Sequence, residues 1–137
     1  MLQKCGLEKI VFMLYNYSIF ENGFGSFMAI MVNIYYTGIN GNAVKFAKEM
    51  TESGIVSQIR AEDGNLRYDY CYLLDDCETV LLIDSWVDQH ALDVHHASPM
   101  MQKIIELREK YNLSMRVERY LLDESGVPEK DKAFIRY

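Results

Sequence analysis

Proline, cysteine and basic residues are scarce in this sequence of 137 residues, which has only two prolines and three cysteines. Its 14 lysines and arginines stand against 20 aspartates and glutamates, and the formal net charge is −6. A chain without a basic surplus is poorly suited to neutralise phosphate groups, which argues against a nucleic-acid-binding protein. The same shortage leaves no lysine or arginine cluster to hold an anionic membrane surface.

The three cysteines, Cys5, Cys71 and Cys77, are odd in number and form no C-x-x-C pair. They therefore predict neither a disulfide framework nor a zinc knuckle, and a reducing cytoplasm is the expected setting. Long hydrophobic runs are also missing. The apolar run at residues 10–14 is too short to span a membrane, and no small-residue cleavage site follows it, so we expect neither a membrane segment nor a signal peptide.

The length suits one domain with a substantial core. We expect this domain to occupy residues 28–123. Residues 1–27 are either an extension outside it or an added helix or strand that packs on it, and the sequence leaves both readings open. Residues 124–137 form a polar tail that either stays loose or reaches across to a partner.

The residue pattern predicts four strands and two helical regions, each of which consists of two consecutive helices. The strands are expected at 29–38, 65–74, 79–86 and 115–123, and the helices at 42–54, 55–63, 89–96 and 99–111. Asp88 and Ser98 are expected to cap the last two helices, and Pro99 suits a first helical position. The order β-α-β-β-α-β predicts an α+β, ferredoxin-like fold, an antiparallel sheet with helices on one face. Since the other face would be bare and carries aromatic residues, we expect a second copy to cover it.

All three histidines lie in one stretch, WVDQHALDVHHASPMM, at residues 86–101. No two of His90, His95 and His96 are four residues apart, the spacing by which one helix face holds a metal, so we expect no metal site. Phosphate-binding glycine loops and the hydrolase motif G-x-S-x-G are absent as well. His95 is then either a general base in a pocket or a structural histidine, and spacing alone leaves both open.

Aromatic and polar residues suggest where a pocket would lie. Trp86 ends a predicted strand, so it either lines a pocket or belongs to the core. Tyr68, Tyr70 and Tyr72 fall on one strand face and suit a flat aromatic ligand, although such a row also occurs in ordinary sheet packing. Asn33 interrupts an apolar strand, which places it at a pocket or at an edge.

Three segments resemble the antibiotic biosynthesis monooxygenase family, the group that includes quinol monooxygenase-like proteins. They are EDGNLRYDY (62–70), ETVLLIDSW (78–86) and ALDVHHASPMM (91–101). The family pattern has a strand that ends in an acidic residue, one further residue and an aromatic residue, followed nine residues later by a histidine. Asp84, Trp86 and His95 take these places. The resemblance covers residues 29–122 and is more specific for the family than for a substrate.

The resemblance implies a homodimer in which two ferredoxin-like sheets close into a dimeric α+β barrel. Enzymes of this family oxidise electron-rich aromatics such as quinols with dioxygen, and they use no metal, flavin or haem, so no cofactor is expected. On this reading His95 is the catalytic residue, which deprotonates or orients a phenolic hydroxyl. Asn33, Tyr68 and Trp86 then line the cavity for a small aromatic or quinol-like ligand.

The resemblance also leaves alternatives. Similar small proteins act as isomerases that process the autoinducer-2 signal, and others bind a small hydrophobic ligand as dimers without catalysis. Haem-degrading relatives use an asparagine, a tryptophan and a histidine. Here Asn33 lies near the place of that asparagine, but His95 stands where their tryptophan would be and Ile105 near the place of their haem-ligating histidine, which argues against haem degradation.

Overall fold

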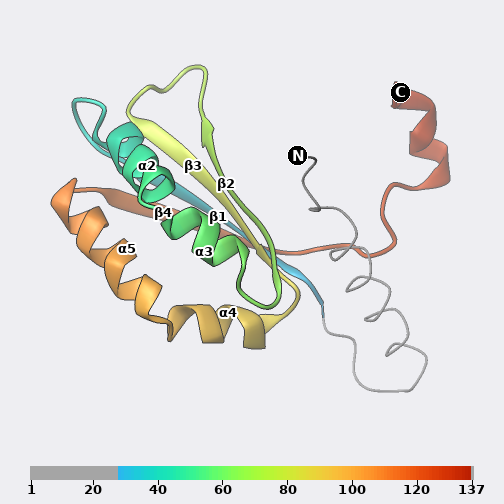
Figure 1. Cartoon of the computed structure of the whole chain (residues 1–137). Coiled ribbons are helices and arrows are strands. Elements are labelled where there is room, and N and C mark those ends of the chain that lie inside the picture. The colour runs from blue at the N-terminus through green and yellow to red at the C-terminus, as the bar shows by residue number, and fades with distance from the viewer. Residues whose placement is uncertain (1–27, 137) are drawn as a thin grey trace, which may run out of the picture.

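The computed structural model describes residues 28–136, so the predicted extension at 1–27 lies outside the described residues. Four antiparallel strands form one sheet in the order β2-β3-β1-β4. The strands are β1 (Ile30–Thr37), β2 (Asn65–Tyr72), β3 (Thr79–Trp86) and β4 (Ser114–Leu121). The helices α2 (Asn42–Glu52), α3 (Ile55–Arg60), α4 (Gln89–His96) and α5 (Pro99–Lys110) lie together on one face of this sheet (Figure 1). The predicted ferredoxin-like α+β fold is confirmed.

The ends of the helices follow the expected local chemistry in part. The Asp88 carboxylate accepts a hydrogen bond from the backbone N–H of Ala91 at 2.8 Å, which caps α4 as predicted. Pro99 is the first residue of α5, where its missing N–H costs nothing. Ser98 does stand at the N-cap position of α5, but its hydroxyl is buried and makes no capping hydrogen bond. The start of α5 is therefore marked by the proline and not by a side-chain cap from Ser98.

Successive side chains along each strand point to opposite faces of the sheet. Ile30, Val32 and Tyr36 of β1 point toward the helices and are buried in the main core. Their partners on β3 are Trp86, Asp84 and Val80, so these side chains share the same face. The residues between them on β1, Met31, Asn33 and Tyr35, face the opposite side and are only partly buried. No described helix lies over that second face (Figure 1).

The three tyrosines of β2 share one face, as predicted. The structure shows that this is the helix face and that they differ in burial. Tyr68 is 2% exposed, Tyr70 is partly buried and Tyr72 is 67% exposed. The reason is the position of β2 at the edge of the sheet, where the strand runs out from under the helices. Tyr68 and Tyr70 can therefore belong to an interior site, whereas Tyr72 stands at its rim.

The C-terminal tail leads away from the sheet in Figure 1 and contains one short 3-10 helix, Glu129–Phe134. Its apolar residues are exposed, and Phe134 is 89% accessible. The prediction that this tail reaches across to a partner stays a prediction. Of the helices in the described part of the chain, none is long and apolar enough to cross a membrane.

Gly64 is the point where the chain turns from the α3 region into β2, and it has a positive φ of 83°. A Cβ atom here would lie 2.6 Å from the Cβ of Ala91 and 2.8 Å from a methyl carbon of Val87. The backbone N–H of Val87 also donates to the Gly64 carbonyl at 2.9 Å. The start of α4 thus packs directly against this glycine, and a side chain would push the two apart.

We expect Gly64→Ala to lower the free energy of unfolding by about 2–4 kcal/mol, because left-handed backbone strain and overpacking add at this position. Gly54→Ala is the matched control. Gly54 has a similar φ of 84°, but a Cβ atom at this position would meet nothing within 4 Å, so only the strain of about 1–2 kcal/mol remains. Urea denaturation of both variants measures the difference. Equal losses would show that the contact with α4 is unimportant.

Candidate functional site

His95 is the buried histidine of the three, with an exposed fraction of 3%, whereas His90 and His96 are exposed. Its imidazole stacks on the indole of Trp86, with ring centroids 4.8 Å apart and an interplanar angle of 29°. The ring of Tyr68 meets it edge-on at 6.4 Å. The structure therefore brings together three of the four residues predicted for the site, from α4, β3 and β2.

Glu62 is the polar partner of His95. The Nδ1 atom of His95 lies 3.1 Å from each of the two carboxylate oxygens of Glu62. Since an ionised carboxylate only accepts hydrogen bonds, Nδ1 must carry the hydrogen. In a neutral imidazole the other nitrogen, Nε2, then holds the free lone pair, which is the arrangement that a general base requires.

The segment Glu62-Asp63-Gly64-Asn65 explains why a carboxylate stands at this point. The backbone N–H of Asn65 donates to the Glu62 carbonyl at 3.2 Å, which closes a tight turn. The Asn65 side-chain amide lies 3.5 Å from the carbonyl oxygen of Ser85 on β3 and 3.3 Å from that of Arg67. The turn is thereby fixed to the neighbouring strand, and it directs Glu62 toward α4.

Asp84 is the hydrogen-bond partner of Trp86. The indole Nε1–H of Trp86 donates to Oδ1 of Asp84 at 2.6 Å, and both residues are buried. Burial raises the pKa of Asp84 to about 7, against a smaller lowering by the Trp86 hydrogen bond, and the charge of Glu62 raises it further. Asp84 therefore takes up a proton close to neutral pH, and the Trp86 ring is held between this carboxyl group and the His95 imidazole.

Tyr68 and Tyr70 extend the site along β2. Their rings meet edge-on with centroids 5.8 Å apart, and Phe46 of α2 contacts Tyr70 in the same manner at 6.0 Å. Burial raises the pKa of both tyrosines well above the usual value, so both phenols are neutral at physiological pH. The Tyr70 hydroxyl is buried and has no hydrogen-bond partner among residues 28–136.

Asn33 does not join these residues. It pairs with Ile83 of β3 and Glu118 of β4, on the face of the sheet opposite Trp86. Its Oδ1 atom is buried without a partner in the described region. Glu62, in contrast, belongs to the site although spacing did not single it out. Glu62 begins the segment 62–70 that carries the family resemblance, which is the signal that could have identified it.

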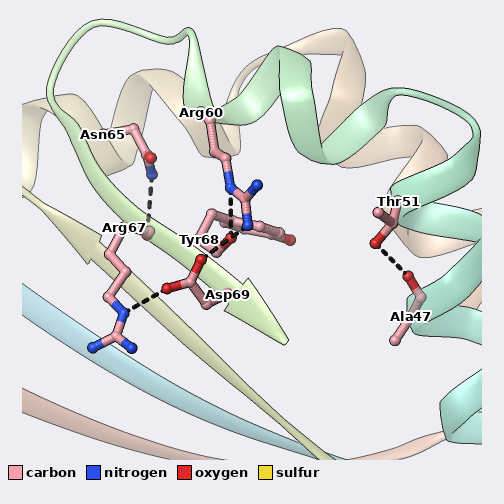
Figure 2. Close-up of polar contacts among 7 residues, drawn as sticks. All are labelled: Ala47, Thr51, Arg60, Asn65, Arg67, Tyr68 and Asp69. Atoms are coloured by element: carbon pink, nitrogen blue, oxygen red, sulfur yellow. Dashed lines mark hydrogen bonds and ion pairs between the residues drawn. The ribbon is translucent and has the colours of Figure 1, made fainter. Parts of the chain in front are cut away.

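A polar network holds the outer edge of β2 beside the site (Figure 2). The Arg60 Nε–H of α3 donates to the Tyr68 carbonyl at 2.9 Å, and its guanidinium also pairs with Asp69 at 2.9 Å. Arg67 donates to the same carboxylate at 2.7 Å and is the main cause of the lowered pKa of Asp69. These exposed ion pairs add little stability in solvent, but they fix α3 against the strand that carries Tyr68.

Two of the cavities on the described surface lie away from His95, which lines neither of them. One, of about 420 Å³, lies at the Thr37 and Leu113 end of the sheet. The other, of about 270 Å³, runs between α2 and β2, and we call it the α2–β2 groove. Its lining includes Ala47, Lys48, Thr51, Tyr70, Tyr72 and Val80. The groove reaches Tyr70, the tyrosine next to Tyr68 on the same face of β2.

Residues 28–136 contain no group of three histidine, cysteine or acidic side chains placed to hold a metal ion. The polar group in contact with His95 is the Glu62 carboxylate, while Asp84 bonds to the neighbouring Trp86 and Tyr68 meets the imidazole through its ring. Chemically, this set can accept a proton from a ligand and stabilise the imidazolium that results.

Comparison with solved structures shows the fold. A protein of unknown function from Bacteroides thetaiotaomicron, described as a possible oxidoreductase, superposes with a TM-score of 0.63 at 14% identity, over 71% of this chain and 100% of its own. A Deinococcus radiodurans protein, named as a candidate antibiotic biosynthesis monooxygenase, gives 0.61 at 20% identity over 69% and 93%. SnoaB from Streptomyces nogalater, a cofactor-independent oxygenase, gives 0.59 at 11% identity over 71% and 95%.

The sequence itself identifies the family. No curated protein matches it significantly. The family model for antibiotic biosynthesis monooxygenase, however, matches residues 29–107, which is more than half of the chain and runs from β1 into α5. This region contains the Glu62 turn, the Asp84–Trp86 pair and His95. The chain therefore belongs to the antibiotic biosynthesis monooxygenase family.

Proposed function

We propose that this protein is a cofactor-independent monooxygenase that oxidises a quinol-like or phenolic small molecule with dioxygen. The observation that carries the proposal is the buried His95–Glu62 pair, within a domain whose family is known for this chemistry. A phenol becomes much easier to oxidise once it has lost its proton, so the protein must supply a base and an apolar environment. Among the described residues, the buried His95 is the histidine with a carboxylate partner.

In this proposal His95 receives the proton of the substrate hydroxyl at Nε2. Glu62 holds the ring in the required tautomer and stabilises the imidazolium that forms. Trp86 and Tyr68 fix the imidazole by their ring contacts and form the apolar wall of the site. The resulting substrate anion gives electrons to dioxygen, and the organic molecule itself supplies them.

We further propose a homodimer that closes through the helix-free face of the sheet, and a cytoplasmic location. The partly buried side chains on that face include Met31, Tyr35, Leu81 and Ile83. An apolar sheet face of this kind is usually covered by a partner. Asn33 lies in the same surface, so its unpaired Oδ1 would find a partner across the dimer, or contact a ligand held between the two sheets.

The dimer predicts twice the chain mass of 16.0 kDa in light scattering at micromolar concentration. Ile83→Arg, at the centre of the helix-free face, should give a monomer, because a buried charge without a partner is costly at such an interface. Val94→Arg, on the exposed surface of α4, is the matched control and should remain dimeric. A monomeric wild-type protein would contradict the proposed barrel.

His95→Asn should lower the turnover of a dihydronaphthoquinone by about 10²–10⁴-fold, the usual effect of losing a general base. Asparagine keeps an N–H donor for Glu62, but its amide is far too weakly basic to take up the proton. Oxygen uptake measures the rate, and thermal melting shows whether the variant is folded. The exposed His90→Asn should keep wild-type turnover. Near-full activity of a folded His95→Asn variant would refute the role of His95.

The raised pKa of Asp84 should make the free energy of unfolding depend on pH. Because its pKa rises from 3.8 to about 7 on folding, the folded state binds a proton more tightly than the unfolded state. Below pH 4 both states are protonated, and stability falls as the pH rises from about 4 to about 7. Relative to Asp84→Asn, the wild type should lose up to about 4 kcal/mol of unfolding free energy over this range. Asp63→Asn, an exposed control, should follow the wild type.

A further inference from the structure

Asp84 is a buried carboxyl group that stability alone does not explain. It lies on the helix face of β3, is 4% exposed, and pairs with Val32 of β1 and Tyr68 of β2. Among residues 28–136, no lysine, arginine or histidine forms an ion pair with its carboxylate. Burying a carboxylate without a cation opposes folding, and the raised pKa of Asp84 reflects that cost. Groups of this kind gather at functional sites.

The hydrogen bond from Trp86 connects Asp84 to the site. The indole Nε1 lies 2.6 Å from Oδ1 of Asp84, whereas a neutral N–H···O bond measures about 2.9–3.0 Å. Hydrogen bonds to charged acceptors are shorter and stronger. A neutral amide at this position would also satisfy the indole N–H, without the cost of a buried charge. The negative charge of Asp84 therefore needs an explanation besides its role as an acceptor.

The ring of Trp86 lies between this charge and His95. The imidazole stacks on the indole with ring centroids 4.8 Å apart, within the roughly 6 Å over which an aromatic face attracts a cation. An indole whose N–H is held by a carboxylate has more electron density in its ring, so it attracts a cation more strongly. A neutral imidazole gains little from this effect. The contact is therefore stronger once the imidazole has become an imidazolium.

Two carboxyl groups thus act on the same imidazole from different directions. Glu62 meets its edge at Nδ1, 3.1 Å away, and the Asp84–Trp86 pair lies against its ring face. The other titratable groups that face Asp84 are phenols whose pKa is raised by burial, namely Tyr36, Tyr68 and Tyr70. These phenols are neutral at physiological pH. Within the described residues, the charges of this buried cluster are those of Glu62, Asp84 and His95.

We propose that Asp84 is a positioning residue that acts through Trp86: it fixes the indole and, as a carboxylate, stabilises the imidazolium that His95 becomes when it takes up a proton. The proposal rests on the proposed function for the source of that proton, a phenolic hydroxyl. Asp84 makes its hydrogen bond to the indole and not to the imidazole. Since its contribution grows only when the imidazole is charged, Asp84 supports proton transfer rather than ligand binding.

The first test needs no turnover. Nuclear magnetic resonance of the full chain with labelled histidine gives the ratio of protonated to neutral His95 at pH 7, and the signal is assigned by its loss in His95→Asn. Asp84→Asn keeps an acceptor for the indole but removes the charge. It should lower this ratio about three- to tenfold, the range expected for a strengthened cation–π contact. An unchanged ratio would overturn the proposal.

Asp93→Asn is the matched control for the loss of a carboxylate. Asp93 is exposed and lies on the same helix as His95, two positions away, so solvent screens its charge. This variant should change the ratio less than twofold. An effect as large as that of Asp84→Asn would show that the ratio follows the net charge of the protein, and it would overturn the specific role of Asp84.

The route through the indole is tested by replacing Trp86 with benzothienylalanine, which keeps two fused rings and lacks only the N–H. In this background Asp84→Asn should change the ratio of protonated to neutral His95 less than twofold. An undiminished effect would show that the carboxylate acts on His95 directly and would overturn the role of Trp86. Thermal melting of each variant shows that it is folded.

Turnover separates this proposal from the proposed function. For oxygen uptake with a dihydronaphthoquinone, Asp84→Asn should lower kcat about three- to tenfold and leave KM unchanged, because the imidazolium forms after binding. A change in KM alone would overturn the positioning role. His95-dependent oxygen uptake with an unchanged ratio in Asp84→Asn would refute the role of Asp84 and leave the proposed function standing. A lowered ratio in a protein without oxygen uptake would have the opposite meaning.

Discussion

The hydrogen bond between His95 and Glu62 is the interaction on which the rest of the site depends. It joins α4 to the turn before β2, two segments separated by 33 positions in the chain. The stack on Trp86 fixes the face of the imidazole, and Glu62 fixes its edge, so the ring has one orientation and one tautomer. Gly64 allows this contact, because any side chain there would push α4 away from the turn.

Much of the fold could be predicted because its signals are local. The cap at Asp88 and the proline at position 99 mark boundaries that the structure reproduces closely. Strand alternation correctly grouped Tyr68, Tyr70 and Tyr72 on one face. It could not show that their burial declines along β2, since that depends on which part of the strand the helices cover.

The site was harder to predict, because it depends on which face of the sheet each residue occupies. Asn33 and Trp86 both interrupt or end apolar strands, yet the register between β1 and β3 puts them on opposite faces. Neither spacing nor composition contains that register. Glu62 lies outside every regular element, and its role appears only once the turn has folded back against Ser85. Pairing between distant segments is the information that a single sequence lacks.

Trp86 is the single tryptophan of the chain, and it is fully buried between Asp84 and His95. Light at the long-wavelength edge of protein absorption excites tryptophan selectively. The fluorescence that it produces therefore originates inside the candidate site. A protonated imidazole stacked on indole quenches its excited state by accepting an electron, and the hydrogen bond to Asp84 shifts the emission wavelength. The protein thus carries a built-in optical probe of the charge on the two groups that flank this ring.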